Sequence, residues 1–278
     1  MQKRVMAISD ISCMGKCSLT VALPIISAVG HECVIMPTAL LSTHTAQKFG
    51  EYVSFDMTEQ LQEIAHHWSS LDTKFDAIYS GYIVSAKQGE YIYNIINEFK
   101  SSNTLVVVDP ILGDNGRLYR GFTSENIDAV RRLCSVADII TPNLTEGSLL
   151  TGVNSDGQHI SNDDLRKMID ALSRLCSKKI VITGVETQPN IISTVAHDCA
   201  TGETVFHNNP RILGSVHGSG DIFASTLTAM SLTTSDFNKA VAAAVNFTYF
   251  AVADSKGDPD SRWYGVNFEK NLNKIKDL

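Results

Sequence analysis

The stretch from His217 to Ser225, HGSGDIFAS, places a carboxylate beside backbone that is free to bind an anion. Asp221 follows two glycines and a serine and precedes an apolar run with helical spacing. An aspartate at a helix start commonly accepts hydrogen bonds from backbone N–H groups, so a helix cap is one interpretation. Free N–H groups at a helix start also bind anions, and Gly218 and Gly220 allow the backbone to approach a ligand closely. Because a carboxylate repels a bound anion, the stretch is either a simple cap or part of a reaction that uses both groups.

Two further stretches carry acidic or amide side chains where a strand ends. In VVVDPILGDNG, Asp109 and Asp114 form either a turn or a carboxylate pair near Mg²⁺ or its water shell. In ADIITPNLTEGSLLTG, Asn143 or Thr145 can cap a helix that has Glu146 in its first turn. The alternative is that Asn143 and Glu146 hold a hydrated Mg²⁺ together with nucleotide phosphates.

Several common catalytic motifs are absent. MGKCS lacks the first glycine of a phosphate-binding P-loop and has a cysteine after the lysine, and GSGDIF ends in phenylalanine where a dinucleotide fingerprint needs glycine. No H-E-x-x-H, G-x-S-x-G or metal-spaced Cys/His cluster occurs. Nicotinamide, zinc-protease and serine-hydrolase chemistry are therefore disfavoured.

Short apolar runs alternate with longer helical patterns, and this alternation must position the polar residues. It predicts an α/β fold with a mostly parallel central sheet, helices on both faces and an antiparallel hairpin at one edge. No linker or internal repeat is visible, so residues 1–278 are expected to form a single domain. Ligands of such sheets bind beyond the carboxyl ends of the strands. Strands are predicted at 4–8, 33–37, 75–82, 104–110, 137–143, 178–184, 190–197 and 202–208, and helices at 19–30, 58–68, 86–100, 124–134, 162–176, 236–254 and directly after Asp221.

Composition narrows the possible partners and compartment. The 278 residues carry a formal charge of -7 with no basic stripe, which argues against nucleic acid or acidic lipid as partners. The N-terminal apolar run is interrupted by Asp10, and nothing approaches the roughly 20 apolar residues of a membrane helix. Six cysteines without a C-x-x-C pair are typical of free thiols in a reducing cytosol. A cytoplasmic protein without a membrane partner is expected.

Taken together, the motifs resemble the ribokinase-like superfamily and, within it, the pyridoxal/pyridoxamine kinase family. GSGD is similar to the superfamily's G-x-G-D, TPNLTE to its T-P-N-x-x-E, and DPILGD to the D-P-V-x-G-D of its vitamin kinases. The segment STHT and the segment SGY at Ser80 to Tyr82 resemble parts of the vitamin pocket. The resemblance runs from Val5 to about Asp254, with the motifs in the family's order.

The resemblance implies a role for each candidate residue. Asp221 would take the proton from the substrate hydroxyl, and the N–H groups of Gly218, Ser219 and Gly220 would hold the transferring phosphoryl group. Thr45 of STHT and Tyr82 of SGY would line the pocket of the pyridine ring. ATP and its Mg²⁺ would be held by Asp109, Asp114, Asn143, Glu146 and Thr183, with Asp109 and Glu146 nearest the metal.

One position departs from the family pattern. Where these kinases usually carry serine followed by histidine, this chain reads ISDIS, with Asp10 in the position that should meet the ring substituents. A carboxylate there could pair with a protonated pyridine or with the amine of pyridoxamine. This pairing would favour pyridoxamine or an aminopyrimidine as substrate.

The resemblance therefore predicts an ATP- and Mg²⁺-dependent kinase that phosphorylates the 5′-hydroxymethyl group of a B6 vitamer. The alternatives are a hydroxymethylpyrimidine kinase of thiamine synthesis, a sugar or nucleoside kinase, and a catalytically silent vitamin- or partner-binding protein. A homodimer and a monovalent cation are also implied by the resemblance. Residues 113–122, GDNGRLYRGF, are the predicted closing loop over ATP.

Overall fold

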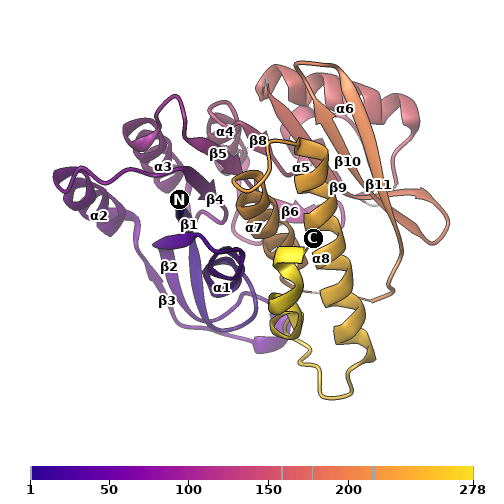
Figure 1. Ribbon diagram of the computed structural model, residues 1–278, viewed down its shortest axis with the longest axis horizontal. Coiled ribbons are helices and arrows are strands. Elements are labelled where there is room, and N and C mark those ends of the chain that lie inside the picture. The colour runs from indigo at the N-terminus through magenta and orange to yellow at the C-terminus, as the bar shows by residue number, and fades with distance from the viewer. Residues whose placement is uncertain (1, 158, 177, 215–216, 278) are drawn as a thin grey trace. The chain divides into compact units, whose positions relative to one another are not determined.

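A computed structural model describes residues 2–157, 159–176, 178–214 and 217–277 (Figure 1). The strands are β1 (Arg4–Met14), β2 (Glu32–Thr43), β3 (Ser54–Asp56), β4 (Ala77–Ser80), β5 (Leu105–Val108), β6 (Gly113–Asp114), β7 (Arg117–Leu118), β8 (Ile139–Ile140), β9 (Lys179–Gln188), β10 (Ile191–Asp198) and β11 (Glu203–Pro210). The α-helices are α1 (Leu19–Val29), α2 (Thr58–Ser70), α3 (Ala86–Phe99), α4 (Ser124–Cys134), α5 (Leu144–Thr151), α6 (Asn162–Leu175), α7 (Ser219–Ser231) and α8 (Phe237–Gly257). Two 3-10 helices, η1 (Gln47–Phe49) and η2 (Phe268–Asp277), complete these elements.

The sheet has nine strands in the order β11-β10-β9-β8-β5-β4-β1-β2-β3. Strand β1 runs parallel to β2 and β4, and β8 runs parallel to β5 and β9. Strand β10 is antiparallel to both β9 and β11, which confirms the predicted edge hairpin. The predicted α/β class with a mostly parallel sheet is therefore confirmed. Strand β3, antiparallel to β2 at the other edge, was not predicted, because its three exposed residues are too few to form a periodic pattern.

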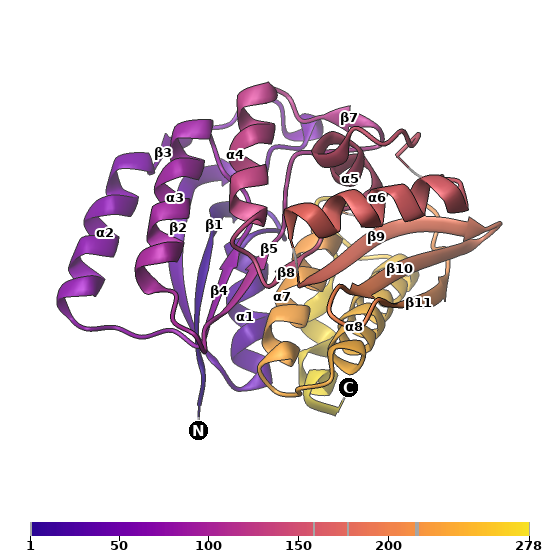
Figure 2. The ribbon, with the colours of Figure 1, turned by 90° about the horizontal axis from the view of Figure 1, so that it is seen from above.

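The chain forms two compact units. Unit 1 comprises Met1–Val84, Ile95–Leu105 and Ile212–Leu278, and unit 2 comprises Ser85–Asn94 and Val106–Arg211. In unit 1, residues Val5 to Ile8 of β1 are fully buried, as expected for a parallel strand that is covered on both faces. Helix α1 packs on β1 and β2, and α2 also packs on β2 (Figure 2).

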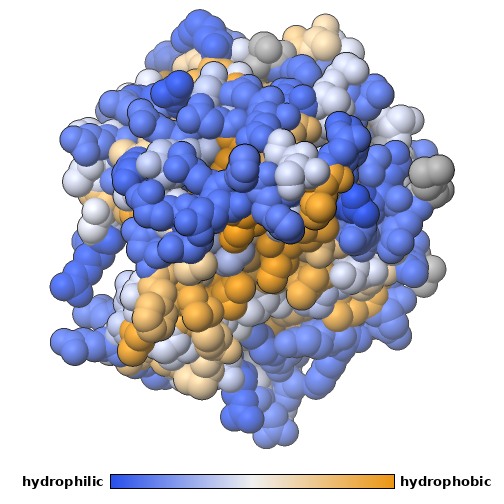
Figure 3. Space-filling view, turned by 90° about the vertical axis from the view of Figure 1, so that its left-hand side faces the viewer, coloured by the Kyte–Doolittle hydropathy of each residue, from blue (hydrophilic) through white to orange (hydrophobic). Residues whose placement is uncertain are grey.

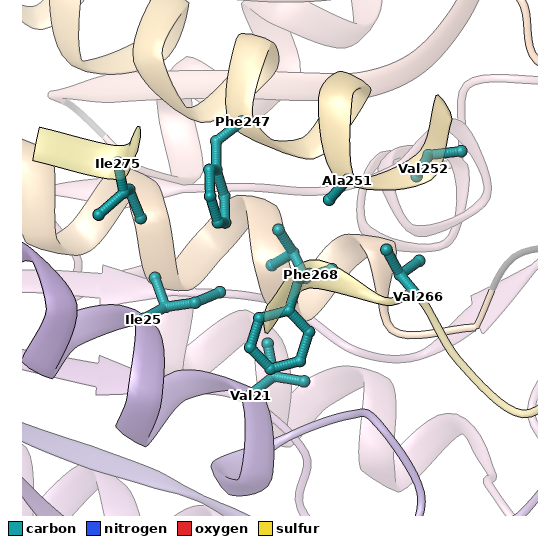
Figure 4. Packing of buried hydrophobic residues seen from close by; sticks show 9 residues of the cluster. Val21, Ile25, Phe247, Ala251, Val252, Val266, Phe268 and Ile275 are labelled. Atoms are coloured by element: carbon teal, nitrogen blue, oxygen red, sulfur yellow. The ribbon is translucent and has the colours of Figure 1, made fainter. Parts of the chain in front are cut away.

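A hydrophobic cluster in unit 1 joins helices from opposite ends of the sequence (Figure 4). Val21 and Ile25 of α1 meet Phe247 of α8 and Phe268 of η2, and all four side chains are at least 98 % buried. Ile222 of α7 belongs to the same cluster and is fully buried. Packing of this kind holds the start of α7 against α1, because a buried side chain of this size contributes about 2 kcal/mol through its apolar area.

Unit 2 is built from β5, β8 and the β9–β11 meander. Helix α6 packs on α5 and β9, and α5 packs on β9 and on the small β6–β7 hairpin. In α6, Leu165, Met168 and Leu172 recur at helical spacing and are buried. Ser161 begins α6 by accepting a hydrogen bond from the Asp164 N–H. These contacts place the start of α5 and the end of β8 close to the hairpin.

One strand boundary and one helix cap differ from the sequence-based expectation. Strand β1 continues past Ile8 to Met14 and therefore contains Asp10. Helix α2 begins with Thr58 as its first helical residue, while Met57 is its N-cap. The hydroxyl and N–H groups of Thr58 instead donate hydrogen bonds to the Asp56 carboxylate. The pattern at 58–68 also predicts Thr58 as the cap of this helix, and that prediction is wrong because Met57 occupies the cap position.

One side of the molecule carries a band of hydrophobic residues among polar ones (Figure 3). In unit 1, Val53 and Phe55 at the β3 edge are 58% and 60% exposed, which makes them unusually open for large apolar side chains. Among the described residues, no helix combines the length and the apolar character needed to cross a membrane.

Candidate active site

The turn that begins α7 has the geometry of an anion-binding helix start. Gly218 is the N-cap in the left-handed conformation, with φ 83° and ψ 1°. Asp221 lies in the first turn of the helix and is half-buried. Because Gly218 occupies the cap position, the interpretation of Asp221 as the N-cap is wrong. The N–H groups of the first turn have no intrahelical acceptors and are therefore available to an anion.

The MGKCS segment forms the seat of this turn. A Cβ atom on Gly218 would lie 1.9 Å from the carbonyl oxygen of Lys16, so only glycine fits at this position. The Lys16 ammonium donates hydrogen bonds to Asn267 at 2.7 Å and to Glu269 at 2.9 Å. The MGKCS segment, which lacks the P-loop motif, thus packs against the α7 turn. Its Lys16 side chain also ties the turn to the C-terminal part of unit 1.

Asp10 is 4% exposed, and both of its carboxylate oxygens accept hydroxyl hydrogen bonds. Ser18 donates to one oxygen at 2.5 Å, and Ser12 donates to the other at 2.8 Å. Burial raises the pKa of Asp10, and the two serine hydrogen bonds partly oppose that rise. The Cys17 thiol, whose pKa is raised by burial and by the charges of Asp221 and Asp10, lies near both carboxylates.

Tyr82 and Thr45 lie on the same unit as Asp10 and Asp221. The Tyr82 N–H donates to the Ser9 hydroxyl at 3.1 Å. Burial, followed by the charge of Asp10, raises the pKa of the Tyr82 hydroxyl to about 12. Thr45 is exposed in the loop that follows β2.

An aromatic group that the sequence analysis did not identify connects the Thr45 loop to the α7 turn. The His44 ring lies 4.9 Å from the His217 ring and 4.9 Å from the Phe49 ring. The Phe49 ring packs at 4.6 Å on the ring of Trp263, and the Lys48 ammonium lies 4.5 Å from the centre of that indole. No sequence signal links these residues, since about 200 positions separate the loop from Trp263.

In unit 2, Asn143 and Glu146 form a capping box at the start of α5. The Asn143 carboxamide oxygen accepts from the Glu146 N–H at 2.9 Å, and the Glu146 carboxylate accepts from the Asn143 N–H at 2.9 Å. The other carboxylate oxygen of Glu146 accepts from the Leu112 N–H at 3.1 Å, and the Asn143 amide donates to the Gly113 carbonyl at 2.9 Å. The capping role predicted for Asn143 is confirmed, and the pair also fixes the loop that carries Asp114.

Asp109 and Glu146 are a pair of buried, mutually interacting carboxyl groups. Asp109 accepts a hydrogen bond from the Thr141 hydroxyl at 2.7 Å, and burial raises its pKa to about 7. The pKa of Glu146 is raised well above its ordinary value, first by burial and then by the charge of Asp109. Such a pair fits a nearby divalent cation, because added positive charge would favour the ionised form of both groups. Among the described residues, no cluster of three or more His, Cys, Asp or Glu side chains is arranged to hold a metal ion.

A cavity of about 180 Å³ opens within unit 2. Three of its lining residues, Asp114, Asn143 and Thr183, were predicted to contact ATP. Arg211 also lines the cavity and is paired with Glu186, whose carboxylate lies 3.3 Å from His159 Nε2. Neither Arg211 nor Glu186 was predicted, because Glu186 lies on β9, Arg211 directly follows β11, and neither matches a motif.

The structure thus gathers the predicted residues within each unit. Unit 1 carries the predicted catalytic and vitamer-binding residues, which are Asp10, Thr45, Tyr82, Gly218, Ser219, Gly220 and Asp221. Unit 2 carries all of the predicted nucleotide-binding residues, which are Asp109, Asp114, Asn143, Glu146 and Thr183. The individual roles of these residues stay predictions.

Comparison with known protein families shows which family the chain belongs to. The sequence profile of the phosphomethylpyrimidine kinase family matches residues 25–260. The chain belongs to this family. Membership of the phosphomethylpyrimidine kinase family confirms the predicted ribokinase-like relationship, and the relatives below support its pyridoxal kinase branch.

Two relatives with solved structures match this chain over its whole length. A pyridoxal kinase from Lactobacillus plantarum is 31% identical with a TM-score of 0.90, and the match covers 100% of this chain and 98% of that one. A Bacteroides thetaiotaomicron protein assigned as a phosphomethylpyrimidine kinase, in a crystal form with pyridoxal, is 31% identical with a TM-score of 0.93, covering 100% and 96%.

Curated relatives match over shorter segments. The pyridoxal kinase PdxY of Actinobacillus pleuropneumoniae is 33% identical over 132 residues, which are 45% of this chain and 45% of that protein. The chain spans between 45% and 65% of the length of the first curated relatives that it matches.

Proposed function

We propose that the protein is a kinase that transfers the γ-phosphoryl group of ATP to the 5′-hydroxymethyl group of a B6 vitamer. The observation that carries the proposal is the full-length match to the Lactobacillus plantarum pyridoxal kinase, supported by the related Bacteroides protein in its crystal form with pyridoxal. The α7 turn of unit 1 and the cavity of unit 2 supply the two kinds of site that this reaction needs.

Asp221 is proposed as the general base. Its carboxylate accepts the proton of the vitamer hydroxyl while the hydroxyl oxygen bonds to the γ-phosphorus and the bond from that phosphorus to the β,γ-bridging oxygen of ATP breaks, releasing ADP. The N–H groups of Gly218, Ser219 and Gly220 stabilise the charge on the transferring group, which is where electrostatic stabilisation of phosphoryl transfer acts. The left-handed Gly218 supports this role because it begins the helix without placing a Cβ atom beside the turn.

Thr45 and Tyr82 are proposed to line the vitamer pocket. Two features support this assignment, namely the proximity of Tyr82 to Asp10 and the stacking of the Thr45 loop on His217, next to the α7 turn. The prediction that Asp10 pairs with an amine of the substrate stays open, and a comparison of pyridoxamine with pyridoxal tests it.

Unit 2 is proposed to hold the triphosphate through Asp114, Asn143 and Thr183 in the cavity wall. Asp109 and Glu146 are proposed to hold the water shell of Mg²⁺, which would neutralise phosphate charge when bound. The high pKa values of these two carboxyl groups support the assignment, because each is destabilised in its charged form until a cation approaches. A monovalent cation, implied by the resemblance alone, is a further proposal.

The test is ADP release with Mg·ATP and, side by side, pyridoxal, pyridoxamine, pyridoxine and hydroxymethylpyrimidine. We expect turnover of at least one B6 vitamer above that of the pyrimidine. Turnover of the pyrimidine alone would favour the second candidate, a hydroxymethylpyrimidine kinase, which the name of the matching family supports. Absence of turnover with all four compounds would contradict both candidates and leave a sugar kinase or a silent binding protein.

We also propose a homodimer that works in the cytoplasm. The exposed Val53 and Phe55 at the β3 edge support self-association, because exposed apolar side chains of this kind mark interaction surfaces. Light scattering at micromolar concentration tests the proposal, and a mass equal to that of one 278-residue chain would contradict it.

A further inference from the structure

Ser18 has a backbone conformation that serine rarely adopts. It is the N-cap of α1, with φ 52° and ψ -133°, and it makes no side-chain capping bond. A serine at this position usually has an extended backbone and accepts a hydrogen bond from a helix N–H group. A residue with a side chain held at positive φ carries a backbone cost, so an interaction in the folded protein must offset that cost at Ser18.

The Ser18 carbonyl accepts from the Val21 and Ala22 N–H groups of α1, and the Ser18 side chain is bonded to Asp10. The Ser18 hydroxyl donates to the Asp10 carboxylate at 2.5 Å, and both side chains are at least 95% buried. Ser12 donates to the second carboxylate oxygen at 2.8 Å, which fixes the orientation of the carboxylate. A hydrogen bond to a buried carboxylate is among the stronger side-chain interactions, so it can offset the backbone cost.

The conformation of Ser18 determines where the residues before it lie. Lys16 is two residues away, and its carbonyl oxygen is the atom that a Cβ on Gly218 would meet. Its ammonium is held at the other end by Asn267 and Glu269. The Cys17 thiol between them is close enough to Asp221 and Asp10 for both charges to raise its pKa. The segment therefore lies between the buried Asp10 and the turn that carries Asp221.

We propose that Asp10 is a positioning residue that holds Ser18 in its left-handed conformation and thereby fixes the Gly15–Ser18 segment on which the Gly218–Asp221 turn is seated. The consequence for turnover rests on the proposed role of Asp221 as base. The structural part of the inference, that Asp10 orders the segment, stands independently of any kinase activity.

Three variants separate positioning from contact with the substrate. Asp10→Asn keeps an oxygen that accepts from Ser18 and an amide that donates to Ser12, so it should retain at least about 10-fold more turnover than Asp10→Ala. Asp10→Ala removes the restraint and should lower kcat about 100-fold by the same factor for pyridoxal, pyridoxamine and pyridoxine, with each vitamer KM unchanged within about 2-fold. Asp10→Ala combined with Ser18→Gly should recover at least about 10-fold of that loss, because glycine adopts positive φ without a restraint.

A chemical readout follows the segment without relying on activity. Alkylation of Cys17 by iodoacetamide, measured by peptide mass spectrometry, should be at least about 10-fold faster in Asp10→Ala than in Asp10→Asn, which removes the same charge, and should return toward the Asp10→Asn rate in the double variant. Cys33 of β2 is the internal control, and its rate should stay constant if the variants remain folded. If Asp10→Ala does not fold, the turnover and the Cys17 alkylation rates of Asp10→Asn and Ser18→Gly are compared with those of the wild-type protein instead.

Two results would overturn the inference. The first is a selective rise of the pyridoxamine KM in Asp10→Asn, which would show that the carboxylate meets the substrate amine. The second is unchanged Cys17 reactivity in a folded Asp10→Ala, which would show that the segment does not depend on Asp10. Failure of the wild-type protein to phosphorylate any vitamer would overturn only the proposed function, because the alkylation result would still test the role of Asp10.

Discussion

Asp10 in unit 1 and Glu146 in unit 2 are both 4% exposed, yet their carboxylates are satisfied by different kinds of donor. Glu146 accepts from two backbone N–H groups, those of Asn143 and Leu112. Asp10 accepts from two hydroxyls, those of Ser12 and Ser18. A backbone N–H donor at a helix start is present in any helix of this kind. The Ser12 and Ser18 hydroxyls, in contrast, depend on the side chains at these positions, and the Ser18 hydroxyl restrains the Ser18 backbone. Unit 2 therefore presents its polar groups on ordinary helix-start geometry, and unit 1 depends on a specific side-chain restraint.

The largest effect should come from Asp221→Asn, which removes the proposed base and keeps its shape. We expect kcat to fall about 1,000-fold, because general base catalysis typically contributes 10²–10⁴-fold. The KM for ATP should change little, since the proposed nucleotide contacts lie on unit 2. Steady-state kinetics and ATP binding by calorimetry check both statements, and a variant with wild-type turnover would remove Asp221 as base.

Gly218→Ala tests the seat of the α7 turn. The added methyl group would meet the Lys16 carbonyl at φ +83°, so we expect turnover to fall more than 10-fold and unfolding free energy to drop by about 3 kcal/mol. Gly152→Ala is the matched control in unit 2, because Gly152 also has positive φ, at +78°, but nothing lies within 4 Å of its added Cβ. It should cost only about 1 kcal/mol in urea unfolding. Equal losses in the two variants would contradict the close approach at Gly218.

The carboxyl pair of unit 2 predicts a pH-dependent stability in the absence of ligands. Burial raises the pKa of Asp109 from 3.8 to about 7, so between these values the folded protein binds more protons than the unfolded chain. Stability should therefore fall as the pH rises through this window, by at most about 1.4 kcal/mol per pH unit for one carboxyl group. Urea unfolding at pH 5 and pH 7 should show a smaller difference in Asp109→Asn. Asp170 is exposed, so Asp170→Asn is the control and should keep the wild-type difference in stability between pH 5 and pH 7. An equal pH dependence of stability in Asp109→Asn and Asp170→Asn would show that Asp109 is not its source.

The smallest expected effect is that of Thr183→Val at the cavity wall. Loss of one hydrogen bond to a phosphate oxygen should raise the KM for ATP about 5-fold, which corresponds to about 1 kcal/mol. The KM for the vitamer serves as the control and should not change. A rise in the vitamer KM instead would break the assignment of nucleotide contacts to unit 2.

The elements that the sequence predicted well are those with local signals. Helix α1 ends at the expected Gly30, which is left-handed at φ 111°, and the Asn143 cap of α5 follows from residues only three positions apart. The role of Asp10 could not be predicted, because the left-handed backbone of Ser18 leaves no mark in the amino-acid pattern. The contact between Gly218 and Lys16 joins segments about 200 residues apart, and no local rule links them. Arg211 was not predicted for the same reason, since its partner Glu186 lies on β9 and no local pattern links the two residues.

The hydrophobic cluster that covers α1 has a consequence for synthesis of the chain. Unit 2 is made almost entirely from one continuous segment, whereas Val21 and Ile25 need Phe268 and Ile275 to complete their surroundings (Figure 4). On the ribosome, α1 emerges long before these last partners exist, so its apolar face stays uncovered while unit 2 is being made. Unit 1 therefore completes its core only after Phe268 and Ile275 have been made, and a chaperone that shields apolar surface would act on α1 during that interval.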